Sequence, residues 1–248
     1  MRAIRMTMVS VVVVLAVLAG IGWAFHKSHA RSALLLADID HVSAYPALAA
    51  SARARGRRIF LDQCAACHGA AARGDRSAGV PDLTDRDFLY GQGRASEIEQ
   101  IVLHGIRSGD SKGWRLAVMP AYGTARPSAT EPLKPLSPAA INNIIQYLRK
   151  RAGLPHEAAS AALGGPVFSG SGGCWDCHGP EGYGDSAIGA PNLVDRIWLY
   201  GDGSPAWVFR SISEGRHGRC PAFVRRLDPV SIRQVAIYVA SLVTGGKS

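Results

Sequence analysis

A five-residue motif that occurs twice constrains this chain more than any other feature of its sequence. Cys64-Ala65-Ala66-Cys67-His68 is repeated as Cys174-Trp175-Asp176-Cys177-His178, and the two copies contain four of the five cysteines. Two thiols at this spacing can form thioether bonds to both vinyl groups of one haem, and the adjacent histidine can reach the iron. The motifs therefore predict two covalently bound haem c groups, attached through Cys64, Cys67, Cys174 and Cys177, with His68 and His178 as iron ligands. A disulfide or zinc site at both places is the alternative.

The two motifs lie within a longer internal repeat. The copies are displaced by 110 positions, as Cys64 and Cys174 show, and the match extends over the residues that follow each motif. Paired positions include Gly79 and Gly189, Pro81 and Pro191, Leu89-Tyr90-Gly91 and Leu199-Tyr200-Gly201, and Gly105 and Gly215. A repeat of this kind predicts two copies of one structural unit.

Each copy ends in an expected helix with the same start signals. Ser137 and Asp228 are suitable N-caps, and the prolines that follow them suit the first helical turn. Both segments then place apolar residues on one helical face, and neither repeat shows an extended β-pattern. We predict an all-α fold with two tandem domains, residues 52–152 and 165–245, joined by a linker over residues 153–164. Residues 107–136, rich in Pro, Gly, Ser and Thr, predict a surface loop.

The first thirty residues predict a membrane anchor or a secretion signal. Arg2 and Arg5 precede an uncharged stretch from Thr7 to Phe25, which is long enough to cross about 30 Å of hydrocarbon as a helix. Its length and Lys27 favour an uncleaved anchor over a cleaved signal. We expect residues 1–30 to form a cytoplasmic stub and a transmembrane helix, residues 31–51 to form a linker, and the haem domains to lie in the periplasm of a bacterium. Secretion to the periplasm after cleavage is the alternative.

Several longer runs resemble one family of membrane cytochromes. They are Pro81-Asp82-Leu83-Thr84-Asp85, His104-Gly105-Ile106-Arg107, Gly189-Ala190-Pro191-Asn192-Leu193-Val194-Asp195, Trp198-Leu199-Tyr200-Gly201 and Gly215-Arg216-His217-Gly218-Arg219-Cys220-Pro221-Ala222-Phe223. From about Leu34 to Val243 the chain resembles the membrane-anchored dihaem subunit of the C-family (cbb-type) haem-copper oxidases. The resemblance implies two class I cytochrome c domains in tandem. It also implies that they pass single electrons in a bacterial respiratory chain, from a soluble cytochrome or a quinol-linked donor towards a terminal oxidase.

The resemblance also implies roles for several residues around each haem. The carbonyl groups of Pro81 and Pro191 would accept a hydrogen bond from the second ring nitrogen of the ligand histidine, which orients the ring and raises its basicity. Tyr90, Tyr200 and Trp198 are either haem-edge residues or core aromatics.

In that family a methionine followed by proline is the sixth iron ligand. Met119-Pro120-Ala121-Tyr122 matches this pattern for the first haem, whereas the aligned run in the second repeat is Cys220-Pro221-Ala222-Phe223. No methionine follows Met119. The second iron then has Cys220 or His217 as its sixth ligand, or it stays five-coordinate. Cys220 is favoured because it aligns with Met119 in the repeat. A thiolate ligand would place the potential of the second haem below that of the first.

Charge narrows the choice of partners. The formal net charge of +9 arises from 28 Lys and Arg against 19 Asp and Glu, which suits anionic lipid or an acidic protein. We expect no nucleic acid as a partner, because no binding motif accompanies the charge. The expected partners are a membrane oxidase or dehydrogenase complex and the membrane itself. Electron transfer, without catalysis by this chain alone, is the leading function. The alternatives are an electron acceptor for a periplasmic dehydrogenase, and a dihaem enzyme that acts on a sulfur compound or a peroxide.

Overall fold

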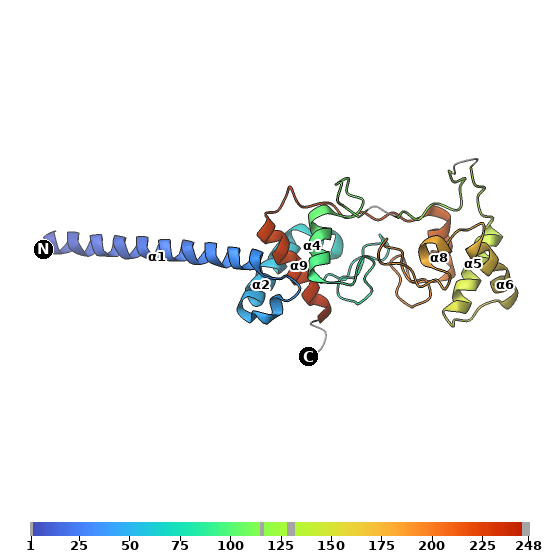
Figure 1. Ribbon diagram of the computed structural model, residues 1–248, viewed down its shortest axis with the longest axis horizontal. Coiled ribbons are helices and arrows are strands. Elements are labelled where there is room, and N and C mark those ends of the chain that lie inside the picture. The colour runs from blue at the N-terminus through green and yellow to red at the C-terminus, as the bar shows by residue number, and fades with distance from the viewer. Residues whose placement is uncertain (1, 115–116, 128–131, 245–248) are drawn as a thin grey trace.

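A long N-terminal helix, α1 (Arg2–Leu36), projects from an elongated helical body (Figure 1). The computed structural model describes residues 2–114, 117–127 and 132–244, with side chains at 14–23, 28–114, 117–127 and 132–243. The short helix η1 (Val42–Ala44) precedes α2 (Pro46–Gln63), α3 (Ala65–His68), α4 (Ala95–His104), α5 (Pro138–Arg151), α6 (Ala158–Ser169), α7 (Trp175–His178), α8 (Pro205–Glu214) and α9 (Pro229–Thr244). The predicted all-α class is confirmed over these residues, which contain isolated β-bridges between the helices.

The helices that end the two repeats begin where their capping residues predict. Helix α5 begins at Pro138, and the Ser137 hydroxyl accepts a hydrogen bond from the Ala140 amide at 3.1 Å. Helix α9 begins at Pro229, and the Asp228 carboxylate accepts from the Val230 amide at 3.1 Å. Both prolines occupy the first turn, where a missing N–H leaves no hydrogen bond unmade. The capping residue and the proline therefore determine where α5 and α9 begin.

The helices pair across the two repeats rather than within them. Helix α2 of the first repeat packs against α9 of the second, and α6 of the second repeat packs against α5 of the first. Phe60 on α2 contacts the Tyr238 ring on α9, with centroids 5.5 Å apart, and Phe168 on α6 contacts Tyr147 on α5 at 5.4 Å. The two helix pairs are built alike, but each takes one helix from each repeat.

A glycine allows close approach in each helix pair. A methyl group at Gly56 would overlap the backbone of Gln234 on α9, and one at Gly164 would overlap the backbone of Asn143 on α5. Side-chain-free positions of this kind let two helix backbones come into contact, so that the neighbouring aromatic rings interlock.

The body consists of two lobes that this exchange defines. The N-lobe comprises residues 37–106 and 220–244 and contains α2, α3, α4 and α9; the C-lobe comprises residues 117–127 and 132–216 and contains α5, α6, α7 and α8. The chain leaves the N-lobe after α4 and returns before α9, along the two crossing segments at the top of Figure 1. The predicted domain bounds, residues 52–152 and 165–245, follow the sequence repeat, and the two lobes do not coincide with them because each lobe takes helices from both repeats.

One local prediction needs correction. Helix α6 begins at Ala158, inside the expected linker 153–164, because this alanine-rich segment forms a helix that packs on α5. The expected surface loop at residues 107–136 holds the first crossing segment, and its residues 115–116 and 128–131 lie outside the described residues. Its described positions have irregular backbone and are exposed or partly exposed, apart from Tyr122 and Arg126, which are 6% and 9% exposed.

The predicted anchor lies within α1. Its segment, Thr7–Phe25, includes residues 7–13 and 24–25, whose side chains lie outside the described residues. A search of the described residues finds no helix that is long and apolar enough to cross a membrane. Arg233 of α9 joins the end of α1 to the N-lobe, because its guanidinium donates to the carbonyl groups of Leu34, Leu35 and Ala37 and pairs with Glu99 at 2.9 Å.

Candidate haem sites

Each Cys-x-x-Cys-His motif forms one helical turn that holds its histidine in place. Helix α3 ends at His68 and α7 ends at His178, and in each case the histidine amide donates to the carbonyl group of the first cysteine at 3.0 Å. The glycine that follows each histidine has a positive φ, 74° at Gly69 and 72° at Gly179, so the chain turns sharply away.

The ring of each histidine is oriented by a proline carbonyl, as the family resemblance implies. The Nδ1 atom of His68 lies 3.3 Å from the Pro81 carbonyl oxygen, and that of His178 lies 2.9 Å from the Pro191 oxygen. Nδ1–H donates in this geometry, which leaves Nε2 with a free lone pair for iron. Burial lowers the pKa of both imidazoles, so the neutral, ligating form is favoured.

The surroundings of both motifs fit a covalently attached haem. A methyl group at Gly69 or Gly179 would meet no atom within 4 Å, so there is open space beside each ligand histidine. All five cysteines are free thiols, and Cys64 and Cys174 are half-buried. Paired thiols, a neutral imidazole with a free Nε2 and adjacent space are the elements that covalent haem attachment needs.

The segment with Cys220 lies in the N-lobe, beside the first motif. Ile106 and Cys220 exchange two backbone hydrogen bonds, of 2.9 and 3.0 Å. Burial, followed by the charge of Cys220, raises the pKa of Cys64 to about 11, and Cys220 also interacts electrostatically with Cys67. Cys220 therefore lies beside the motif that contains His68, which belongs to the other repeat.

The segment with Met119 lies in the C-lobe, beside the second motif. Met119 and Arg216 exchange two backbone hydrogen bonds, of 3.1 and 3.0 Å. Met119 packs on the same hydrophobic cluster as Cys174. Burial raises the pKa of nearby Tyr122 to about 12, with the Cys174 thiol as the next cause. Alignment of the repeats pairs Met119 with the first haem and Cys220 with the second, whereas the structure places the Met119 segment beside the second motif and the Cys220 segment beside the first.

The alternative ligand His217 is less well placed. Its side chain is exposed, whereas Cys220 is half-buried next to the first motif. His41 and His104 contact nearby carboxylates, of Asp38 at 2.8 Å and of Asp110 at 3.2 Å, and His156 contacts the Leu154 carbonyl group at 2.9 Å.

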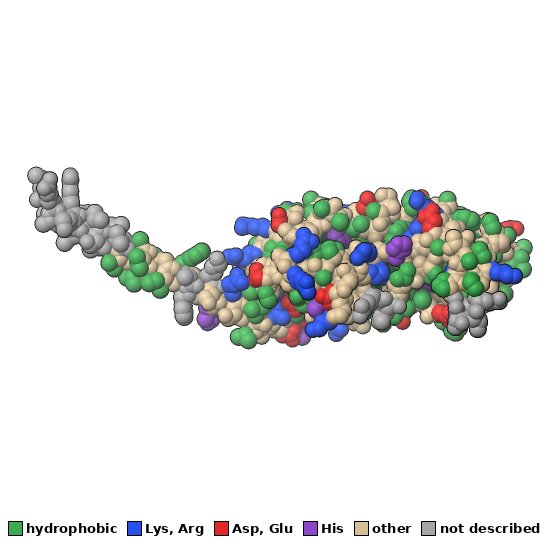
Figure 2. All heavy atoms as spheres, turned by 90° about the horizontal axis from the view of Figure 1, so that it is seen from above, with side chains coloured by type: hydrophobic (Ala, Val, Ile, Leu, Met, Phe, Trp, Pro, Cys, Tyr) green, Lys and Arg blue, Asp and Glu red, His purple; other side chains and the backbone are tan. Residues whose placement is uncertain are grey.

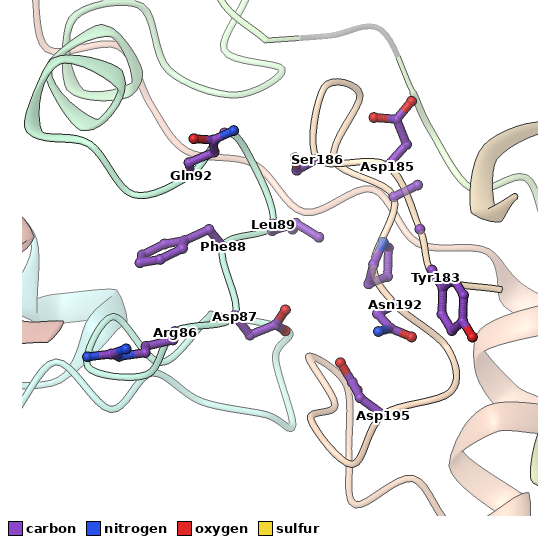
Figure 3. A pocket seen from close by; sticks show the side chains of 14 residues that line it. Arg86, Asp87, Phe88, Leu89, Gln92, Tyr183, Asp185, Ser186, Asn192 and Asp195 are labelled. Atoms are coloured by element: carbon purple, nitrogen blue, oxygen red, sulfur yellow. The ribbon is translucent and has the colours of Figure 1, made fainter. Parts of the chain in front are cut away.

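A cleft of about 460 Å³ separates the loops that follow the two motifs (Figure 3). Asp87 of the first repeat and Asp195 of the second point toward each other across it. Burial raises the pKa of Asp87 to about 6, and the charges of Asp195 and Asp85 contribute. The sequence-based predictions did not include this pair. The available signal was the doubled loop itself, which brings acidic residues from both repeats to one place.

The raised pKa of Asp87 predicts a pH-dependent stability. A carboxyl whose pKa is higher in the folded protein favours folding while it is protonated, and this contribution is lost as the pH rises from about 4 through about 6. Asp87→Asn should therefore raise the free energy of unfolding above pH 7 by about 1 kcal/mol, after allowance for solvent screening, and change it little near pH 4. Denaturant titrations of both proteins at the two pH values test this. Equal stability of the two proteins at the higher pH would show that burial and the neighbouring charges do not disfavour the ionised Asp87 carboxylate.

Basic side chains are concentrated on the lobe next to α1, as the view in Figure 2 shows. Helix α2 of this lobe has four exposed arginines: Arg53, Arg55, Arg57 and Arg58. Their position near the end of the long helix suits contact with anionic headgroups, although a solvated helix face has the same composition.

The cytochrome c family profile matches residues 53–152. The cbb3-type cytochrome c oxidase subunit FixP of Bradyrhizobium sp. (strain ORS 278) is 41% identical over 217 residues, which cover 87% of this chain and 69% of that protein. FixP of Azorhizobium caulinodans is 38% identical over 88% of this chain and 70% of its own length. The subunit CcoP of Cereibacter sphaeroides is 36% identical over 90% of this chain and 72% of its own length.

Proposed function

Because this chain belongs to the FixP/CcoP family of cbb3-type cytochrome c oxidase subunits, we propose that it passes single electrons from a donor outside the cytoplasm to the catalytic part of such an oxidase. It is a c-type cytochrome with two covalently bound haem c groups. The observation that best supports the proposal is the doubled motif, in which each histidine is held by a proline carbonyl and presents Nε2.

Four cysteines and two histidines would hold the two haems. Each bound haem supplies an iron that changes between Fe(III) and Fe(II), which is the one-electron chemistry of the function. Cys64 and Cys67 tether the group in the N-lobe, and Cys174 and Cys177 tether the group in the C-lobe. His68 and His178 are the proximal ligands, each oriented from behind by its proline carbonyl.

The sixth ligands would come from the exchanged segments. In the N-lobe the half-buried Cys220 faces the His68 site, which gives a His/Cys pair. In the C-lobe Met119 packs next to Cys174, which gives a His/Met pair. A thiolate donates more electron density to iron than a thioether does, so the N-lobe haem has the lower potential. The lobe adjoining α1 therefore contains the low-potential site.

The chain would be held at the bacterial inner membrane by α1, with the lobes in the periplasm. The apolar side chains of Val14, Leu15, Val17, Leu18 and Ile21 on α1 are all more than half exposed. Burial of such a surface in lipid is favourable. Arg2 and Arg5 precede the apolar segment and suit the cytoplasmic side.

Haem content and oxidase association test the proposal. Protein matured together with the cytochrome c assembly system should have the mass of the polypeptide plus two haems. The full chain should co-purify with oxidase activity from the membrane fraction and be oxidised by that complex under oxygen. A single haem, or bound zinc, would contradict the cofactor assignment. Two haems with oxidation by peroxide instead, or reduction by a periplasmic dehydrogenase without oxidase, would replace the proposed partner with one of the alternatives.

A further inference from the structure

The two lobes meet through a reciprocal pair of contacts made by the Leu-Tyr-Gly triplets. The Gly91 amide donates to the Ser186 carbonyl at 3.0 Å, and the Gly201 amide donates to the Arg76 carbonyl at 2.9 Å. Each bond joins the triplet of one repeat to the loop of the other. The contact is thus made twice, by equivalent residues.

The tyrosine of each triplet lies against a glycine of the opposite repeat. The Tyr200 ring fills the space in front of Gly79, and the Tyr90 ring fills that in front of Gly189, so that a methyl group at either glycine would overlap the ring. Both glycines also have positive φ, 68° and 77°, which a larger residue adopts only with strain. Glycine is needed here for both reasons.

These glycines belong to the short loops that orient the ligand histidines. Gly79 stands two residues before Pro81, whose carbonyl group faces His68, and Gly189 stands two residues before Pro191, whose carbonyl group faces His178. A pair of backbone hydrogen bonds closes each loop, between Asp75 and Val80 and between Asp185 and Ala190. A ring that presses on the glycine therefore acts on a stiff loop that ends at the proline.

Each tyrosine also contacts an arginine that lies next to a candidate sixth ligand, Cys220 or Met119. Arg107 donates to the Tyr90 hydroxyl at 3.0 Å, and the Arg216 guanidinium lies 4.6 Å from the centroid of the Tyr200 ring. Arg107 follows Ile106, which pairs with Cys220, whereas Arg216 itself pairs with Met119. Each tyrosine thus contacts an arginine beside the sixth-ligand segment of one haem site, the segment with Cys220 or with Met119. The same ring contacts the glycine of the proline loop at the other haem site.

We propose that Tyr90 and Tyr200 are positioning residues that couple the two haem sites: Tyr200 holds the Pro81 loop and through it the His68 ring, and Tyr90 holds the Pro191 loop and the His178 ring. The inference rests on the proposed haem attachment. Removal of a tyrosine ring lets its loop move, which weakens the histidine-to-carbonyl hydrogen bond. That bond raises the basicity of the histidine and favours Fe(III), so its loss raises the potential of the haem in the opposite repeat.

The test is a redox titration of the full haem-loaded chain in which each haem is identified by its ligand spectrum. Tyr200→Ala should raise the midpoint potential of the haem attached at Cys64 and Cys67 more than that of the other haem. Tyr90→Ala should do the reverse. Tyr200→Phe and Tyr90→Phe, which keep the ring, should restore most of the wild-type values. Tyr45→Ala, at an exposed tyrosine on the N-lobe, is the matched control and should shift neither potential.

Several results would overturn the inference. They are a larger shift at the haem of the same repeat, equal shifts at both haems, or no shift in a variant that retains two haems. If an alanine variant fails to fold, Tyr→Leu at the same position keeps bulk without a flat ring and should still give the crossed shift. Mass measurement of the wild type separates the two hypotheses, because a protein without two haems contradicts the proposed function itself. Two haems with unshifted potentials contradict only the role of the tyrosines.

Discussion

Cys220→Met should raise the midpoint potential of the haem attached through Cys64 and Cys67 by several tenths of a volt. Axial ligands alter haem potentials over a range of about 0.8 V, and exchange of a thiolate for a thioether is among the larger steps within it. The structure places Cys220 beside Cys64 and Cys67, so the N-lobe haem should respond and the C-lobe haem should change little. Spectroelectrochemical titration of both proteins measures the two potentials.

Two further variants separate the possible ligands of the N-lobe iron. Cys220→Ala should remove the thiolate signature from the electron paramagnetic resonance spectrum, and His217→Ala should leave it intact. The opposite pattern would make His217 the ligand and Cys220 a packed thiol. If neither substitution alters the spectrum, the N-lobe iron has an open face. A ligand-binding or peroxide-dependent role would then replace simple electron transfer.

Met119→Ala should abolish the weak sulfur-to-iron charge-transfer band of the oxidised protein and lower the potential of the C-lobe haem. Thioether ligation raises haem potentials, and no other methionine lies after residue 8. The haem attached through Cys174 and Cys177 should therefore lose its strong-field sixth ligand, while the N-lobe haem is unaffected. Val118→Ala, at an exposed neighbour, is the control and should keep the band. Persistence of the band in Met119→Ala would exclude Met119 as a ligand.

Features determined by nearby residues could be predicted from the sequence. The starts of α5 and α9 follow from a capping side chain and a proline, and each ligand histidine meets the proline that the family resemblance indicated. The exchange of segments could not be predicted in this way. Both repeats carry the same complementary surfaces. One helix of each repeat presents a glycine and a phenylalanine, Gly56 and Phe60 or Gly164 and Phe168. The last helix of each repeat presents a tyrosine, Tyr147 or Tyr238. Pairing within or between repeats satisfies the same contacts, so local pattern does not distinguish them.

The lobe that each candidate sixth ligand enters could not be predicted for the same reason. Alignment of Cys220 under Met119 correctly identified equivalent positions, but equivalence within a repeat does not say which lobe a segment enters. The sequence identified the coupling tyrosines as part of the doubled Leu-Tyr-Gly triplet and as either haem-edge residues or core aromatics. Their partners, Gly79 and Gly189, are equally doubled, yet contact between the two sets depends on how the lobes meet. Repetition in sequence indicated which residues matter, and tertiary structure indicated what they touch.

Removal of one haem at a time tests the exchanged ligand pairs most directly. In Cys64→Ala/Cys67→Ala the only covalent haem left is the one in the C-lobe, and in Cys174→Ala/Cys177→Ala it is the one in the N-lobe. Exchange predicts that the first variant keeps the methionine charge-transfer band and the high potential, and that the second shows a thiolate-ligated, low-potential haem without the band. The reverse distribution would contradict the account, because it would pair Met119 with His68 and Cys220 with His178 inside their own repeats.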